Sequence, residues 1–564
     1  MATLQGLSFP SLQAWSSVIS FQNAFLTIST IGVLTALVSF FHKGKQDGIP
    51  ELRGTIPYLS STLLYMTDMR TFLDRARDML RTSRIMSLKL GPETLYIIKG
   101  AENVATMFKT TTTRTSPVGQ RRFILRIQKY LWGAVPADYA KFLNDTSGRA
   151  KVPLPGTENT PESKRYWRIL NDKLHDYFAI SSETNALVAV YQRELSKRLE
   201  QDFPTTEWTT IMVYAFLQKY MASAATTTLL GPRILTVNPD FHNVLWTFDR
   251  FVASLVWGLP KWLTPRAWKT RDRLHAAVHR YLYPAVGEFA WDSDSATADW
   301  EPVFGSRVNR EVIRWMREDG FAPQTIAGAI SILFIFGVNG NTTPVAGWML
   351  METIQRPELL DRIREEVMGT YVTDPKTGER LIDVQKLLAL PLLQSVYTES
   401  MRLHVSMNVT REVVGPMSLE GHKLEIGALL QAPTEISHRE ESVWGVPGHP
   451  ASEFWAERHI KYVERVDEKD GTVKLEPQFD MTGRQNDFFP YGGGAPVCPG
   501  RFFARQEMML SLAILVSRFD IEFVEWTHMD GSPSERPAEN NVEWAGGASV
   551  PPDRDMKIRW KRRW

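Results

Sequence analysis

The hydrophobic positions in the second half of the chain recur mainly at helical spacing. Residues Gln324–Met351 are apolar on most faces, which predicts a long helix buried on all sides. Similar patterns follow Pro357 as far as Val367 and Pro391 as far as Leu403, and proline is common at helix starts. Asp383 precedes a shorter pattern and is a suitable N-cap. This half of the chain is therefore predicted to be mostly helical.

Strand-like alternation of polar and apolar residues is sparse. It occurs at Ser87–Leu90 and again across Ser418–Ile426. We find no fixed-period repeat, which argues against a solenoid or a propeller, and no stretch with the composition of a linker. Residues 48–564 are therefore predicted to form one large domain, mainly α with small β-sheets.

The first 47 residues have a different character. No charged residue occurs from Met1 to Phe41, and Phe21–Phe41 is mostly apolar. As a helix this stretch spans about 31 Å, close to the hydrocarbon thickness of a bilayer. Lys43 and Lys45 follow it directly, which favours a cytoplasmic location for the rest of the chain. Residues 1–47 are predicted to be a single-pass membrane anchor with a basic flank. An interfacial or buried helix is the alternative, because this stretch also contains several Thr and Ser residues.

Composition argues against a nucleic-acid-binding protein and against a protein stabilised by internal disulfides. The net charge is only +2, whereas nucleic-acid-binding proteins usually carry a strong basic excess. The chain has a single cysteine, so an intramolecular disulfide is impossible. A lone cysteine is usually a small buried hydrophobic residue. The residues around this one indicate a different role.

The cysteine, Cys498, lies in a glycine-rich run that begins at Phe488. The three glycines at 492–494 allow a tight turn and a close approach of the backbone to a flat ligand. Pro499 and Gly500 then lead into a predicted helix. A sulfur at a helix start is close to free backbone N–H groups and the positive end of the helix dipole. Both favour the thiolate, which is the form that binds a metal.

This run resembles the cysteine loop of the cytochrome P-450 superfamily. Tyr491, Gly492, Gly494, Cys498 and Gly500 occupy its characteristic offsets. The resemblance implies that Cys498 is the axial ligand to the iron of haem b and that the other four shape the cofactor site. The chain departs from the family pattern twice. Tyr491 stands where Phe is usual, and Pro496 replaces a basic residue that contacts a haem propionate.

Three further charged residues match family positions. Glu399 and Arg402 alone would be an ordinary ion pair one helical turn apart. The residues around them resemble the family helix before the central strands, and Arg458 stands at the position of the family's third partner. The resemblance implies a buried cluster of one carboxylate and two guanidiniums, which holds the cofactor pocket together.

The residues that bind the haem propionates are harder to place. The family motif has Arg four residues after a Trp, but Trp167 is followed four residues later by Asn171. Arg411, nine residues after Arg402, is a candidate propionate partner, and a surface arginine is the alternative.

The long apolar helix contains Pro344, which cannot donate a hydrogen bond to the carbonyl of Gly340. Gly337 and Gly340 remove side-chain bulk from the same stretch. Such a helix could be kinked for packing reasons alone. The resemblance implies instead that the kink makes an oxygen-binding groove.

Most family members place an acid and a Thr in this groove to manage protons, but this chain has Asn341 and Thr342. We expect a water held between Asn341, Thr342 and the Gly340 carbonyl. A register shift of one residue would give the role of Thr342 to Thr343. The pattern resembles the branch that contains bile-acid-forming steroid hydroxylases, prostacyclin synthase and members from fungal secondary metabolism.

The resemblance implies a monooxygenase. It would insert one oxygen atom from O2 into a lipophilic substrate, such as a terpenoid, a steroid-like compound or another secondary metabolite. Electrons from NADPH would arrive through a separate flavoprotein reductase. The protein would lie at the endoplasmic reticulum membrane, with its catalytic domain in the cytoplasm and no nucleic-acid partner.

Two alternatives remain open. A haem-thiolate isomerase or dehydratase would need no reductase, and the missing acid favours it. A non-enzymatic membrane haem-binding protein is the second alternative. A cysteine hydrolase is disfavoured because no His lies near Cys498 in the sequence.

Overall fold

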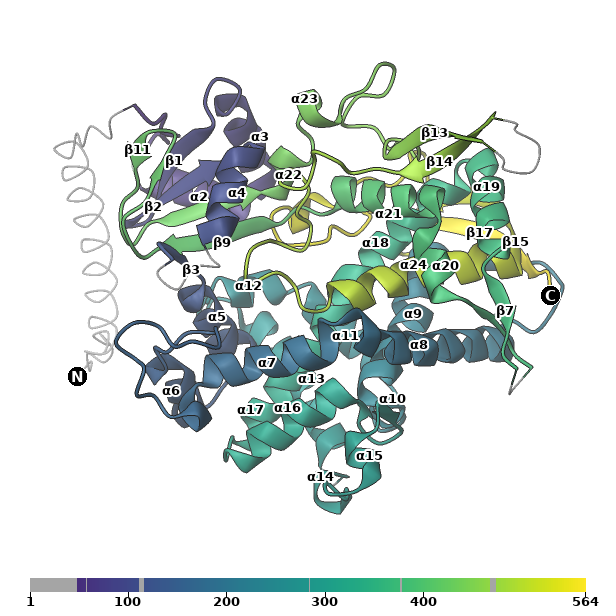
Figure 1. The fold of residues 1–564 in the computed structure, drawn as a ribbon, viewed down its shortest axis with the longest axis horizontal. Helices are drawn as coiled ribbons and strands as arrows, with labels where there is room; N and C mark the ends of the chain where they lie inside the picture. Colours follow the sequence, from purple (N-terminus) through teal and green to yellow (C-terminus); the bar gives the residue numbers. More distant parts are fainter. Residues whose placement is uncertain (1–47, 57, 111–115, 284, 376–377, 467–472) are drawn as a thin grey trace, which may run out of the picture.

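The computed structural model describes residues 48–564, except for residues 57, 111–115, 284, 376–377 and 467–472. It is mainly helical with several small sheets, as predicted (Figure 1). The anchor expected at residues 1–47 lies outside the described residues and stays a prediction.

The largest sheet lies at one end of the molecule, beside helices from the first part of the chain (Figure 1). Its strand order is β1-β2-β12-β9-β3. The strands are β1 (Ile85–Leu90), β2 (Glu93–Ile98), β12 (Leu429–Pro433), β9 (Asn408–Val413) and β3 (Val118–Gly119). Side chains alternate strictly along β9, so Val409, Arg411 and Val413 are all buried. This register turns an arginine inward between two valines.

The long apolar stretch forms the central helix of the molecule. It runs without a break through α17 (Pro323–Ile330), a π-helical segment η3 (Ser331–Phe336) and α18 (Gly337–Ile354). This helix is long and apolar enough to cross a membrane, but 78% of its most apolar 18-residue stretch is buried inside the molecule. It is therefore a core helix, as its all-round hydrophobicity predicted.

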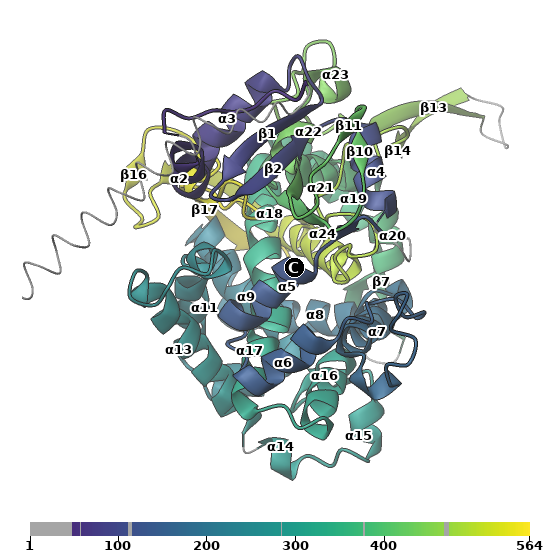
Figure 2. The same ribbon diagram turned by 90° about the vertical axis from the view of Figure 1, so that its left-hand side faces the viewer.

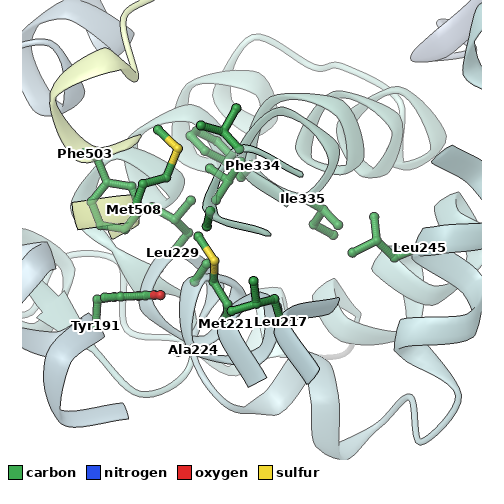
Figure 3. Packing of buried hydrophobic residues seen from close by; sticks show 14 of the residues in the cluster. Tyr191, Leu217, Met221, Ala224, Leu229, Leu245, Phe334, Ile335, Phe503 and Met508 are labelled. Atoms are coloured by element: carbon green, nitrogen blue, oxygen red, sulfur yellow. The ribbon is translucent and has the colours of Figure 1, made fainter. Parts of the chain in front are cut away.

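Helices α9 (Val213–Leu230) and α24 (Arg501–Arg518) pack against this central helix, and α8 (Ser181–Asp202) packs against both of them. Figure 3 shows Tyr191 of α8, Met221 of α9 and Phe503 of α24 in the core that they share with the π-helical segment. Helix α24 starts three residues after Cys498, so its core packing fixes where the cysteine lies.

The other predicted helices are found close to their expected bounds. They are α19 (Pro357–Met368), α20 (Val384–Ala389) and α21 (Pro391–His404). The Asp383 carboxylate caps α20 by accepting hydrogen bonds from two backbone N–H groups. The alternation at 418–426 forms only a short hairpin of β10 (Ser418–Leu419) and β11 (His422–Lys423). Its turn places Glu420 and Gly421 at positive φ, which ends the strands early.

Most of the strands were not predicted from the sequence, and two pairs of them are the longest. Strand β15 (Phe519–Thr527) follows α24 directly and pairs with β17 (Asp555–Arg562). Strands β13 (Ile460–Val466) and β14 (Val473–Phe479) form a hairpin that projects from the body of the molecule (Figure 2).

Candidate active site

The loop before α24 is shaped by its glycines. Gly492 and Gly494 both have a φ of 72°, which a residue with a side chain adopts only with strain. Gly493 lies against the ring of Phe108, and a Cβ atom here would come within 2.3 Å of ring atoms. All three glycines are therefore required for this path of the backbone.

Cys498 is half-buried at the end of this loop. Its backbone N–H donates to the carbonyl of Tyr491 over 3.1 Å, so the loop closes on itself. Burial raises the pKa of the Cys498 thiol, while the N–H groups of Gly500 and Arg501 and the charge of Arg501 act in the opposite direction. The expected helix-start environment is thus present around the sulfur, but it does not outweigh burial.

Tyr491 makes a contact that phenylalanine could not make. Its hydroxyl lies 2.8 Å from the hydroxyl of Tyr397 on α21. Both pKa values are raised, chiefly by burial, so both phenols remain protonated at neutral pH. This hydrogen bond ties the cysteine loop to α21.

Glu399 and Arg402 of α21 meet Arg458 in a fully buried ion cluster. Arg402 donates two hydrogen bonds of 2.8 Å to the carboxylate of Glu399, and Arg458 donates one of 2.7 Å. The Nε2 atom of His459 lies 3.1 Å from the same carboxylate, which the sequence analysis did not predict. Burial opposes ionisation, but the bonds from Arg402 and His459 hold the pKa of Glu399 well below its usual range.

The cluster also organises the chain that leads to the cysteine. Arg402 donates to the backbone carbonyls of His438 and Ala451, and Arg458 donates to those of Pro450 and Glu453. The ring of His438 then accepts a hydrogen bond of 3.1 Å from the N–H of Phe489, at the start of the cysteine loop. The cluster is thereby connected to the loop through one histidine.

Arg411 is 2% exposed, so it is not a surface arginine. It donates over 2.9 Å to the carbonyl of Gly493 in the cysteine loop, while its Nε atom has no hydrogen-bond partner in the described part of the chain. Burial, and after it the positive charge of Arg149, lower the pKa of Arg411 to about 10. Two guanidinium groups therefore lie close together beside the loop.

Arg149 is held in this position by the residue that interrupts the family motif. The carbonyl oxygen of the Asn171 side chain accepts a hydrogen bond of 2.9 Å from Arg149. Burial also lowers the pKa of Arg149. Neither guanidinium has an acidic partner within salt-bridge distance among the described residues. An adjacent, partly buried pair of positive charges fits a ligand with carboxylate groups, such as haem.

Sequence reasoning missed Arg149 because it belongs to an irregular loop, 22 residues before its partner Asn171. The family spacing pointed to position 171, where an amide stands. No local pattern marks an arginine that reaches a site from a loop.

The central helix exposes one narrow face. From Thr325 to Met351 every residue is buried except Leu333, Phe336, Gly337 and Asn341, which recur at intervals of three and four. Gly340 lies on the same face but is covered. The side-chain oxygen of Asn341 lies 3.5 Å from the backbone N–H of Ser549, which closes one side. This face is therefore mainly apolar with one amide.

The two threonines do not reach this face. Thr342 donates over 2.7 Å to the carbonyl of Val338, and its hydroxyl lies 3.4 Å from the buried carboxyl of Glu507 on α24. Thr343 is fully buried, and its hydroxyl has no hydrogen-bond partner within the described ranges. Of the four predicted residues, Asn341 lies on the accessible face and Gly340 is covered beside it, whereas Thr342 and Thr343 are buried.

Comparison with known proteins bears on this arrangement. The family model described as Cytochrome P450 matches residues 137–536. A cytochrome P450 monooxygenase, calL, from Penicillium decumbens is 44% identical over 515 residues, which are 91% of this chain and 93% of that protein. Cholesterol 7-alpha-monooxygenase from Cricetulus griseus is 25% identical over 93% of this chain and 95% of that enzyme.

A solved structure has the same fold. Retinoic-acid-bound cyanobacterial CYP120A1 matches with a TM-score of 0.60 and 17% identity, over 91% of this chain and 99% of the other. Together the relatives confirm the resemblance to fungal members and steroid hydroxylases, and they confirm an enzyme in place of the non-enzymatic alternative. Because the family model covers most of the chain and a close relative aligns along nine tenths of it, this protein belongs to the cytochrome P450 family and is a monooxygenase-type oxidoreductase.

Proposed function

We propose that the protein inserts one oxygen atom from O2 into a lipophilic substrate, with electrons from NADPH delivered by a separate flavoprotein reductase. The observation that carries this proposal is the position of Cys498. It is half-buried at the start of a core helix, in a loop that three glycines shape and two tyrosines brace.

A bound haem supplies the iron at which dioxygen is activated. In our assignment Cys498 would be the thiolate ligand to the haem iron, a role that requires loss of the proton that burial otherwise retains. Arg149 and Arg411 would bind the carboxylate groups of the haem. Glu399, Arg402 and Arg458 do not contact the cofactor but hold the segments that form its pocket.

The accessible face of the central helix suits a lipophilic substrate. Leu333 and Phe336 offer apolar contact area, and Gly337 leaves room beside them. We assign Asn341 as the polar residue of the oxygen-binding groove. Its amide can orient a water but cannot supply a proton itself. Thr342 and Thr343 keep only an indirect role, because both are buried and the Thr342 hydroxyl donates to the carbonyl of Val338. A terpenoid or a steroid-like secondary metabolite would suit this mainly apolar face.

One observation favours an isomerase or dehydratase as the second candidate. Leu333, Phe336, Gly337 and Asn341 include no ionisable side chain. A rearrangement needs no proton from outside, so it could proceed on such a face without a reductase.

The carbon monoxide difference spectrum of the reduced protein tests the central assignment. A thiolate-ligated iron should give the red-shifted Soret band of this family, and Cys498→Ser should abolish both the band and turnover. Retention of both by the variant would disprove the assignment. Coupled consumption of O2 and NADPH would then separate a monooxygenase from an isomerase.

A further inference from the structure

A buried carboxyl group lies next to the glycine of the central helix. Asp249 is the last residue of α11 (Phe241–Asp249) and is only 6% exposed. The preceding residue, Phe248, packs edge to face on Phe336, with ring centroids 5.6 Å apart. This contact brings the end of α11 onto the accessible face of the central helix.

The carboxyl oxygen occupies space that a side chain at position 340 would need. A Cβ atom built on Gly340 would lie 3.1 Å from Oδ1 of Asp249. Gly340 lies on the same helix face as Gly337 and Phe336, which are three and four residues before it, and Asn341 follows it in the next position. The central helix lacks an acid at this place, and Asp249 of α11 puts a carboxyl group beside it instead.

One oxygen of this carboxyl group is buried and unpaired. The Oδ1 atom of Asp249 has no hydrogen-bond partner in the described part of the chain, and an unpaired buried polar atom is costly. Burial raises the pKa of Asp249 to about 8, and the positive charge of Arg250 opposes this only weakly. Burial, together with the negative charges of Asp249 and Asp555, raises the pKa of Tyr214 on α9, so this phenol stays protonated.

We propose that Asp249 is the proton-relay residue for cleavage of the O–O bond. This inference rests on the proposed monooxygenase function. With haem bound, the O–O bond would break and both bonding electrons would leave with the outer oxygen, which would already carry one proton taken up from solvent. Asp249 would supply the second proton through a water oriented by Asn341, so that this oxygen leaves as water. Solvent then reprotonates the carboxylate, and the two electrons of the cycle come from the reductase.

Cumene hydroperoxide tests this step without the natural substrate or a reductase. Cleavage that sends both electrons to the outer oxygen needs a proton and yields 2-phenyl-2-propanol. Cleavage that splits the electron pair needs none and yields acetophenone. In the full-length haem-loaded protein, Asp249→Asn should lower the rate of alcohol formation by about 100-fold, the lower end of what general acid catalysis contributes. Asp249→Glu should restore most of it.

The pH profile gives an independent readout. Alcohol formation by the wild type should fall as pH rises through about 8, where Asp249 loses its proton, and the profile of Asp249→Asn should be flat. Asp138→Asn is the matched control, because Asp138 is equally buried but accepts a hydrogen bond from the N–H of Ala322, before the start of the central helix. This control should leave the ratio of alcohol to ketone unchanged.

Each outcome is decisive. An unchanged product ratio in Asp249→Asn with a normal carbon monoxide spectrum would overturn the relay. If the variant does not retain haem, a wild-type alcohol fraction that is constant from pH 6 to pH 9.5 would overturn it equally. A wild type that lacks the thiolate spectrum would refute the proposed function itself, which is a separate result.

Discussion

Arg149 gives the clearest prediction at the scale of single residues. If it binds a haem carboxylate, Arg149→Ala should lose a charge-assisted hydrogen bond worth about 1.5–3 kcal/mol. Haem transfer from the variant to excess apomyoglobin should then be roughly 10- to 100-fold faster than from the wild type.

Asn171 offers a sharper version of this test. The double variant Arg149→Ala/Asn171→Arg places a guanidinium at the position that the family motif specifies. It should recover slow haem transfer, whereas Arg149→Ala/Asn171→Ala should not. Equal transfer rates in all variants would show that Arg149 serves only the loop that carries it.

The tyrosine pair gives a second prediction at this scale. Replacing either Tyr491 or Tyr397 by Phe leaves the other hydroxyl buried without its partner. Each single variant should therefore lower the free energy of unfolding by about 1–3 kcal/mol. The double variant should cost less than the sum of the two single variants, because it leaves no orphaned hydroxyl. Additive losses in denaturant titrations would show that the hydroxyl groups do not interact.

At the scale of elements, the cluster of Glu399, Arg402 and Arg458 joins α21 to the chain before the cysteine loop. Glu399→Ala leaves two guanidinium groups buried without their anion, which should destabilise the protein by about 3–5 kcal/mol. The yield of haem-loaded protein and the thermal midpoint should both fall. The matched control is Asp361→Ala, which removes an exposed carboxylate from a pair with Arg364 on α19 and should have little effect.

The pH dependence of the cluster has a definite sign. The pKa of Glu399 is lowered by folding from 4.5, so its stabilising contribution is complete above that pH and is lost as the pH falls toward the folded value. Glu399→Gln should therefore flatten the stability curve on its acid side. An acid limb with the same slope in both proteins would contradict a folded-state role for this carboxylate.

The central helix and helices α19 to α21 were predictable because their apolar residues recur at helical spacing and proline or Asp383 marks their starts. Strand β14 was missed although apolar and polar residues alternate along Val473–Phe479; Pro477 interrupts the run, and the strand is almost fully exposed instead of buried on one face. Cys498 and its glycines were predictable because the motif is contiguous. Arg149 and Asp249 were not, because the fold alone brings them to residues distant in the sequence.

At the scale of the whole molecule, the described residues contain every candidate site residue, so residues 1–47 are expected to contribute attachment only. Deleting residues 1–45 should release the protein from microsomal membranes into the supernatant and leave the carbon monoxide spectrum unchanged. Fractionation after carbonate washing measures the first effect. Continued membrane binding of the truncated protein would assign the attachment to another surface and weaken the proposal of an endoplasmic-reticulum anchor.

The half-buried position of Cys498 has an analytical consequence. Because it is the only cysteine in the chain, it is also the only sulfhydryl that a maleimide reagent can alkylate. If iron occupies the sulfur in the loaded enzyme, the mass added by the reagent counts the molecules that lack cofactor. Intact-mass spectrometry of one preparation would then give its occupancy directly, independent of any extinction coefficient.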